Sequence, residues 1–222
     1  MRPKAVSRRE NQKASNRIQI LKVAQELFST HGYHEVSMHL IADESGFSIG
    51  TLYNFFRDKE DLYGVLVRDN FLAFHRELVA ALETHGDEVE RIRAYVSAKG
   101  RIFQSNRSMM RLYFAETRNT SFDIKTGLNA ELRNIYEDFM QRLASVFESG
   151  IKSGLFRPLM KPYYLAVAVA SLTNSFLFLW LEDPEKHPYS ENVETIMKLL
   201  FENIIIYPDG SKALGKGIGR KR

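Results

Sequence analysis

The chain has 222 residues, of which 44% are hydrophobic, and this is enough for a sizeable buried core. It contains no cysteine, which excludes a disulfide scaffold, thiol catalysis and cysteine-ligated zinc. The net charge is +4, but the Lys and Arg residues gather at the two ends, so the middle of the chain is mildly acidic.

Residues 1–14 and 209–222 are predicted to be basic, disordered segments, because charged and polar residues prevail in them. A basic arm suits non-specific attraction to phosphates, although a purely solvating role explains its charge almost as well. No long apolar stretch follows Met1, so we expect no secretory signal and a cytoplasmic protein.

The first helix is predicted over residues 15–31, where apolar residues recur at helical spacing and Gly32 supplies the stop. These apolar positions are Ile18, Leu21, Ala24, Leu27 and Phe28. Ser37 is a good N-cap for a second helix that continues to Ser45.

A tight turn is predicted directly after Ser45. Gly46 can adopt the left-handed conformation that ends a helix, and Phe47 can anchor the turn in the core. Ser48 can cap a third helix that starts at Ser48 or Ile49. Two short helices joined by such a turn are typical of a helix-turn-helix, although an ordinary helical hairpin shows the same bare pattern.

The third helix is predicted to be two-faced. Leu52, Phe55 and Phe56 can face the core. The outer side then carries Ile49, Gly50, Thr51, Tyr53 and Asn54. The second helix of a helix-turn-helix enters the DNA major groove by its N-terminal end, where Thr and Asn can bond base edges or phosphates and glycine permits close approach.

A long helix is predicted from Asp58 to about residue 84. Asp58 is its N-cap, and Glu60 and Asp61 are favourable in its first turn. Lys59 projects where a phosphate could lie. The helix is long enough to join two domains.

The whole run from Ile20 to Leu62 resembles the N-terminal domain of the tetracycline-repressor (TetR) family of bacterial transcriptional regulators. The resemblance covers about residues 17–65 and includes the Gly32-Tyr33, Ser45-Gly46-Phe47-Ser48 and Gly50-Thr51-Leu52-Tyr53 segments. It implies an all-α homodimer with about nine helices per chain. A three-helix DNA-binding domain over residues 15–60 would precede a ligand-binding and dimerisation domain over residues 61–208.

The resemblance also implies which residues contact double-stranded operator DNA. By position these are Ser37, His39, Ser48, Ile49, Gly50, Thr51, Tyr53 and Asn54, with Lys59 on a phosphate. Tyr53 would bond the DNA backbone, which leaves Thr51, Asn54 and His39 as readers of sequence. The family's commonest mode is a repressor that binds a palindromic operator and is released by a small effector.

Four further helices are predicted beyond residue 84 before the last one. Asp87 to Glu90 form a capping box for a helix whose stripe consists of Val89, Ile92, Val96, Lys99 and Phe103. A short helix is expected around residues 109–114 and a loop over 117–128. The next helix carries Leu132, Tyr136, Phe139, Leu143, Val146 and Phe147, and ends near Gly150.

Residues 163–181 carry no charge, so a membrane span has to be weighed. Ser171, Thr173 and Asn174 lie at the centre of this segment, which argues against insertion. A core helix buried against its own domain and a partner subunit explains it better. A last helix is predicted over residues 190–207, and the resemblance implies that these last two helices form the homodimer interface.

No enzyme, metal site or cofactor is expected, because the six histidines show no ligand spacing and no nucleophile elbow or phosphate loop is present. A largely apolar effector, of unknown identity, could occupy a cavity between the middle helices. Its candidate lining is Phe103, Met109, Met110, Tyr113, Phe114, Phe122, Tyr136, Phe139, Asn174 and Phe178, although each could simply pack the core. The alternative function is a helical interaction or membrane-associated module that does not read DNA.

Overall fold

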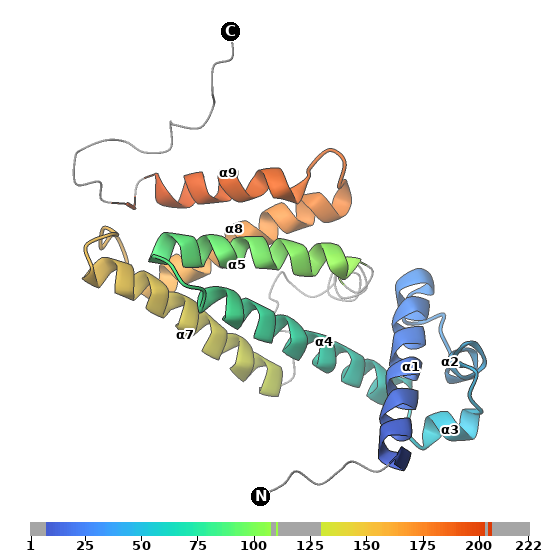
Figure 1. The fold of residues 1–222 in the computed structure, drawn as a ribbon. Coiled ribbons are helices and arrows are strands. Elements are labelled where there is room, and N and C mark those ends of the chain that lie inside the picture. The colour runs from blue at the N-terminus through green and yellow to red at the C-terminus, as the bar shows by residue number, and fades with distance from the viewer. Residues whose placement is uncertain (1–7, 108–109, 111–129, 203, 206–222) are drawn as a thin grey trace, which may run out of the picture. The chain divides into compact units, whose positions relative to one another are not determined.

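The computed structural model describes residues 8–107, 110, 130–202 and 204–205, and its regular elements are all α-helices (Figure 1). The described residues fall into two compact units. One contains residues 8–72 with 106, 107 and 110, and the other contains residues 73–105 and 130–205. Eight helices lie in these ranges. The expected short helix at 109–114 and the loop at 117–128 fall outside the described residues, apart from Met110.

The first unit contains α1 (Arg8–His31), α2 (Met38–Ser45), α3 (Ile49–Tyr53) and the beginning of α4 (Lys59–Leu82). Helix α1 packs on α2, and α2 packs on α3 (Figure 1). The core of this unit is formed by buried apolar side chains from all four helices, namely Ile20, Ala24, Phe28, Ile41, Ala42, Leu52, Phe56, Leu62 and Leu66. This core holds α2 and α3 at a fixed angle on α1.

Helix α1 begins at Arg8, not near Ser15, so residues 8–14 of the expected disordered arm are helical. No glycine or proline interrupts this segment, and its Arg, Glu, Gln, Lys and Ala residues favour helix. Glu10 lies in the first turn, where its negative charge is favourable beside the positive end of the helix dipole. The Gln12 amide donates to Asn16 Oδ1 at 2.9 Å. Local propensity therefore extends the helix beyond its apolar stripe.

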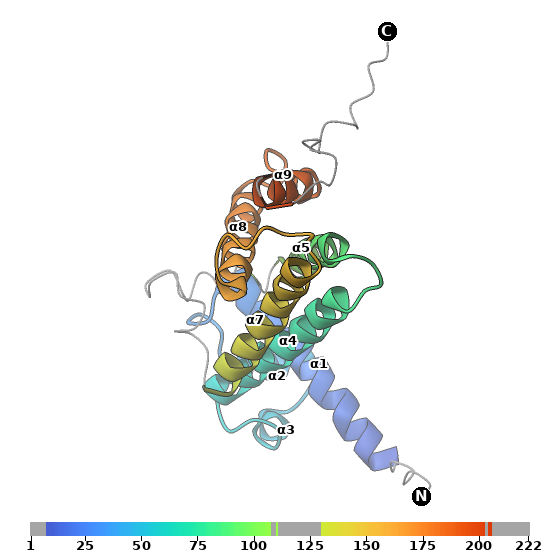
Figure 2. The same cartoon turned by 90° about the vertical axis from the view of Figure 1, so that its left-hand side faces the viewer.

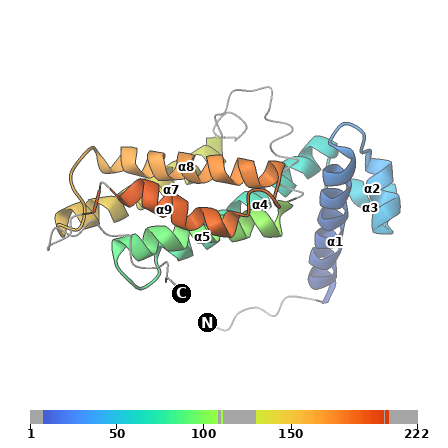
Figure 3. The same ribbon diagram turned by 90° about the horizontal axis from the view of Figure 1, so that it is seen from above.

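The second unit contains the end of α4 and the helices α5 (Glu88–Ser105), α7 (Ala130–Lys152), α8 (Pro162–Glu182) and α9 (Tyr189–Phe201). Helix α5 lies against α7 and α8 (Figure 2), and α9 lies beside α5 and α8 (Figure 3). The predicted capping box of α5 is present. The Glu90 amide donates to Asp87 Oδ1 at 2.8 Å, and the Asp87 amide donates to Glu90 Oε2 at 3.0 Å.

The last helix ends at Phe201, several residues before the predicted end near residue 207. The Arg157 amide donates to the Ile204 carbonyl at 2.8 Å, and Phe156 and Ile205 form an antiparallel bridge. The chain after Phe201 therefore pairs with the segment before α8. Ile204 is still buried, although it lies beyond the end of the helix.

Helix α8 is the one helix in the described ranges that is long and apolar enough to cross a membrane. One side of it is nonetheless packed in the domain core, where Leu165, Ala166, Val169, Ala170, Thr173, Leu177 and Trp180 are buried. On the other side Tyr164, Val167 and Leu179 stay exposed. The chain alone therefore covers only one of the two faces that we expected to be buried.

A glycine allows the close contact between α5 and α9. A Cβ at Gly100 would overlap the ring of Tyr189, which is buried and whose hydroxyl donates to the Val96 carbonyl at 3.0 Å. Because this hydrogen bond and the core hold the ring, it cannot move aside freely.

We predict that Gly100→Ala lowers the free energy of unfolding by ~1 to 3 kcal/mol, since it overpacks the α5–α9 contact. Gly64→Ala is the matched control, because Gly64 lies inside α4 with open space around its Cα, and it should stabilise by ~0.5 to 1 kcal/mol. Urea denaturation followed by circular dichroism measures both. Equal midpoints for the two variants would contradict the contact.

Candidate DNA-binding site and effector domain

The turn between α2 and α3 is built by three caps, as predicted. Ser37 Oγ accepts a hydrogen bond from the Leu40 amide at 3.1 Å. Gly46 is left-handed at φ 72° and ψ 24°, and ends α2. Ser48 Oγ accepts from the Thr51 amide at 3.2 Å and begins α3. The turn is thus fixed by its own side chains and backbone.

The predicted outer face of α3 is only partly exposed. Of the candidate DNA contacts, Ser37, His39, Ser48, Gly50, Tyr53 and Asn54 are exposed, whereas Ile49 and Thr51 are half-buried. The Thr51 hydroxyl lies 2.9 Å from Ser48 Oγ, so it already has a partner inside the cap. Of the three predicted readers of sequence, Asn54 and His39 are thus exposed and Thr51 is half-buried.

The inner face of α3 differs in one respect from the prediction. Leu52 and Phe56 are fully buried, but Phe55 and the turn residue Phe47 are only half-buried. The Lys13 ammonium, on α1, lies 5.9 Å from the Phe55 ring centroid. Phe55 thus joins α1 to the segment after α3 at the edge of the core.

The structure gives the Lys59 ammonium partners in the protein, while its predicted phosphate contact stays a prediction. Its ammonium donates to the carbonyls of Tyr33 and Val36 at 2.9 Å each, and lies 3.4 Å from that of His34. It also lies 4.4 Å from the Tyr33 ring centroid. An ammonium has three donors, and the α1–α2 loop occupies them. Lys59 therefore joins the start of α4 to this loop.

Two exposed cations near α3 were not among the predicted contacts. Arg57 lies between α3 and α4, and its side chain is 84% exposed although it pairs with Asp61 at 3.3 Å. Its amide donates to the same carboxyl group, which lowers the pKa of Asp61. Lys13 is the second cation, and its contact with Phe55 places it beside α3. In the sequence, Lys13 belongs to the basic segment over residues 1–14, and in the structure the end of this segment is part of α1.

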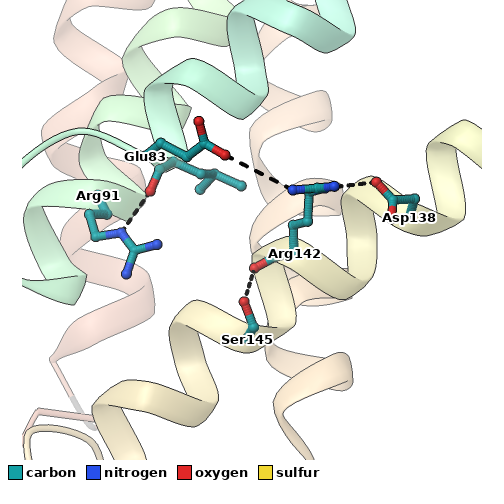
Figure 4. A network of polar contacts seen from close by, with 6 residues as sticks. Glu83, Arg91, Asp138, Arg142 and Ser145 are labelled. Atoms are coloured by element: carbon teal, nitrogen blue, oxygen red, sulfur yellow. Dashed lines mark hydrogen bonds and ion pairs between the residues drawn. The ribbon is translucent and has the colours of Figure 1, made fainter.

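A polar network fastens the end of α4 to α5 and α7 in the second unit (Figure 4). The Arg91 guanidinium donates to the carbonyl of Leu82, the last residue of α4, at 2.6 Å. The Arg142 guanidinium lies between Asp138, at 2.7 Å, and Glu83, at 4.0 Å (Figure 4). Such exposed ion pairs add little stability.

Lys99 is an unusual residue within the apolar stripe of α5. Its ammonium donates to the Tyr95 hydroxyl at 3.3 Å and lies 5.6 Å from the Tyr95 ring centroid. Burial lowers the pKa of Lys99 to about 7, and it raises the pKa of Tyr95 well above its usual range. At neutral pH the tyrosine is therefore uncharged and the lysine is close to its titration midpoint.

The structure describes six of the ten candidate effector contacts. Met110 and Phe139 are buried, and Phe103, Tyr136, Asn174 and Phe178 are half-buried. Phe103 and Tyr136 pack against the core cluster of the second unit, to which Phe139 belongs. Met109, Tyr113, Phe114 and Phe122 lie outside the described residues.

Comparison with known proteins matches residues 20–66 to the model of the bacterial regulatory proteins of the tetR family. The matched segment runs from α1 into the first third of α4 and contains all three caps at Ser37, Gly46 and Ser48. This segment is a TetR-family DNA-binding domain. The chain that carries it is a helix-turn-helix transcriptional regulator, and the all-α architecture of the described residues agrees with that assignment.

The resemblance to TetR regulators extends beyond the DNA-binding domain. The chain is 28% identical to the HTH-type transcriptional repressor KstR2 of Rhodococcus jostii over 152 residues, which are 65% of this chain and 70% of that protein. The structure of FadR from Bacillus subtilis in complex with stearoyl-CoA aligns with a TM-score of 0.68 at 18% identity. That alignment covers 84% of this chain and 98% of the other.

A regulator from Saccharomonospora viridis, solved in complex with choline, aligns with a TM-score of 0.70 at 24% identity. It covers 87% of this chain and 100% of the other.

We predict that Lys59→Met destabilises the DNA-binding domain of this regulator by ~1 to 2 kcal/mol, because three carbonyl groups lose a charged donor. The slope of DNA affinity against salt should stay that of the wild type, since the ammonium contacts no phosphate.

Hydrogen exchange of the α2 amides measures the stability, and fluorescence anisotropy measures the salt slope. Lys22→Met, at an exposed position of α1, is the control for loss of one charge. A variant with wild-type exchange and a shallower salt slope would restore Lys59 to the DNA-contacting residues.

Proposed function

We propose that this regulator is a repressor that binds a near-palindromic operator as a dimer and is released by a small effector. The observation that carries the proposal is the exposed edge of the capped α2–α3 turn, where Asn54, His39 and Tyr53 lie on a rigid support. Such a regulator acts on chromosomal DNA in the cytoplasm.

The DNA contacts divide into two chemical groups. Asn54 and His39 are exposed and carry groups that can bond base edges, whereas Ser48 and Thr51 are already linked to each other. Tyr53, which is 52% exposed, positions the helix by bonding a phosphate. Arg57 and Lys13 replace Lys59 as the phosphate-neutralising cations. Ser37 and the exposed Gly50 lie against the DNA backbone.

Dimerisation through α8 and α9 is supported by their uncovered faces. Tyr164, Val167 and Leu179 on α8 and Leu199 on α9 are between 38% and 59% exposed. Small residues lie among them on α8, where Ala168, Ser171 and Ser175 are exposed too, and this permits close helix approach. A dimer places two copies of α3 about 34 Å apart, in successive major grooves.

Release of the operator is proposed to pass through α4, because this one helix contributes residues to both units. An effector bound in the second unit acts only through its different affinities for the two forms of the protein. Reversing a 99:1 preference for the DNA-binding form requires about 5.5 kcal/mol of such difference. The stearoyl-CoA complex of the FadR structure supports an effector with a large apolar part.

We predict that Asn54→Ala weakens operator binding by ~1 to 3 kcal/mol and relaxes the preference at particular base pairs. Arg57→Ala should instead weaken binding to every duplex and reduce the salt slope by about one. Anisotropy titrations with DNA from upstream of the regulator's own gene, with base-pair variants of it and with scrambled duplex measure both effects.

Lys152→Ala, on an exposed turn of α7, is the control for loss of a cation away from α3. If Asn54→Ala affected all duplexes equally, it would not be a base reader. If the wild-type protein bound operator and scrambled DNA equally at both salt concentrations, the helical interaction module would become the better proposal.

We predict that Val167→Glu converts the dimer to monomer and weakens operator binding at least tenfold, since it buries a carboxylate in the apolar interface. Asn134→Glu adds the same charge at an exposed position of α7 and should leave the dimer intact. Light scattering after gel filtration measures the mass. A Val167→Glu dimer with wild-type DNA affinity would place the interface elsewhere.

A further inference from the structure

Lys99 combines a cationic group with apolar surroundings in the second unit. It lies on α5 between the buried residues Val96 and Ile102, and Phe103 follows on the same stripe. Tyr95, one turn before it, is buried against Phe139 of α7 with ring centroids 5.5 Å apart. The lysine is half-buried, so its side chain is not sealed from solvent.

Among the described residues, the Lys99 ammonium has one hydrogen-bond partner. Its hydrogen bond goes to the neutral Tyr95 hydroxyl, at 3.3 Å. Within the described ranges, no carboxylate lies at ion-pair distance from it, although Arg17, Arg57, Arg93, Arg142 and Lys152 all have such a partner. An ammonium has three donors, and a buried cation without a counter-charge lowers stability. Burial accordingly depresses the pKa of this group.

A ligand that complements the Lys99 ammonium carries a negative charge, since none of the described residues supplies one at ion-pair distance. A carboxylate is compact and accepts charge-assisted hydrogen bonds, and its attraction to the ammonium is strong where water is largely excluded. The neighbouring Phe103 and Phe139 rings favour an apolar body on the same molecule. A cation such as choline would be repelled from Lys99.

We propose that Lys99 binds the carboxylate of an amphipathic monocarboxylic acid, whose apolar body packs on Phe103 and Phe139. The regulatory effect of this ligand rests on the proposed effector response. Its binding to the protein does not depend on DNA. A thioester of such an acid has no charge at this end, so the free acid is the preferred form.

The test uses the full-length protein and two probes of equal chain length, dodecanoate and 1-dodecanol, in isothermal titration calorimetry. Wild-type protein should bind dodecanoate about tenfold or more tightly than dodecanol. Lys99→Met should remove this preference and keep the dodecanol affinity, because the methionine retains the apolar stem. Lys152→Met, which removes an exposed cation of α7, should behave as wild type.

Lys99→Met is not expected to unfold the protein, since it replaces a buried charge by an apolar side chain, and its unfolding midpoint should be no lower than that of the wild type. Equal affinities of the wild type for the two probes would overturn the proposal, as would a preference for dodecanoate that survives Lys99→Met. Absence of dodecanoate binding up to about 1 mM would overturn it too.

An operator titration with and without dodecanoate separates this proposal from the proposed function. If dodecanoate binds through Lys99 but leaves operator affinity unchanged, the acid site stands and effector release fails for this ligand class. If dodecanoate fails to bind while Asn54→Ala still relaxes base preference, the acid site fails and the DNA-binding function stands.

Discussion

The contact between the Lys59 ammonium and the loop before α2 is the interaction on which the DNA-binding domain depends. It joins the first residue of α4 to the carbonyl groups of Tyr33 and Val36, and this loop ends at Ser37, the cap of α2. A displacement at the start of α4 is therefore passed to α2 and, through the Gly46 turn, to α3. At the other end, Arg91 on α5 donates to the carbonyl of Leu82, the last residue of α4. The proposed effector release passes through α4 between these two contacts.

Local rules predicted most of the DNA-binding domain, because its helix ends are determined by side chains close to them in sequence. The caps at Ser37, Gly46 and Ser48 and the capping box at Asp87 all follow from the chemistry of one or two residues. The same rules failed where apolar periodicity was used to place a helix start. Residues 8–14 carry no apolar stripe, yet their helix propensity and the absence of a breaker extend α1 to Arg8.

What the sequence did not predict are contacts between residues that are far apart in the chain. Lys59 has the sequence position of a phosphate ligand, and only the folded loop, more than twenty residues earlier, reveals that its donors are occupied. The end of α9 depends in the same way on the backbone near Arg157, which pairs with Ile204. The pairing leaves Ile204 buried, so the apolar spacing persists after the helix has ended. Periodicity identifies which side chains are buried, but not the backbone conformation that buries them.

Two features of the second unit are explained by the binding of other molecules to it. An apolar side of α8 stays exposed in the single chain, which is costly unless a second protein surface covers it. Lys99 has the opposite character, since it places a cation where the core would be more stable with an apolar residue. Both features lower the stability of the isolated chain, and a different proposed partner relieves each, a second subunit for α8 and an anionic ligand for Lys99. A molecule that binds only one conformation of a protein stabilises that conformation. Binding of an effector to the second unit can therefore change the affinity of the regulator for DNA.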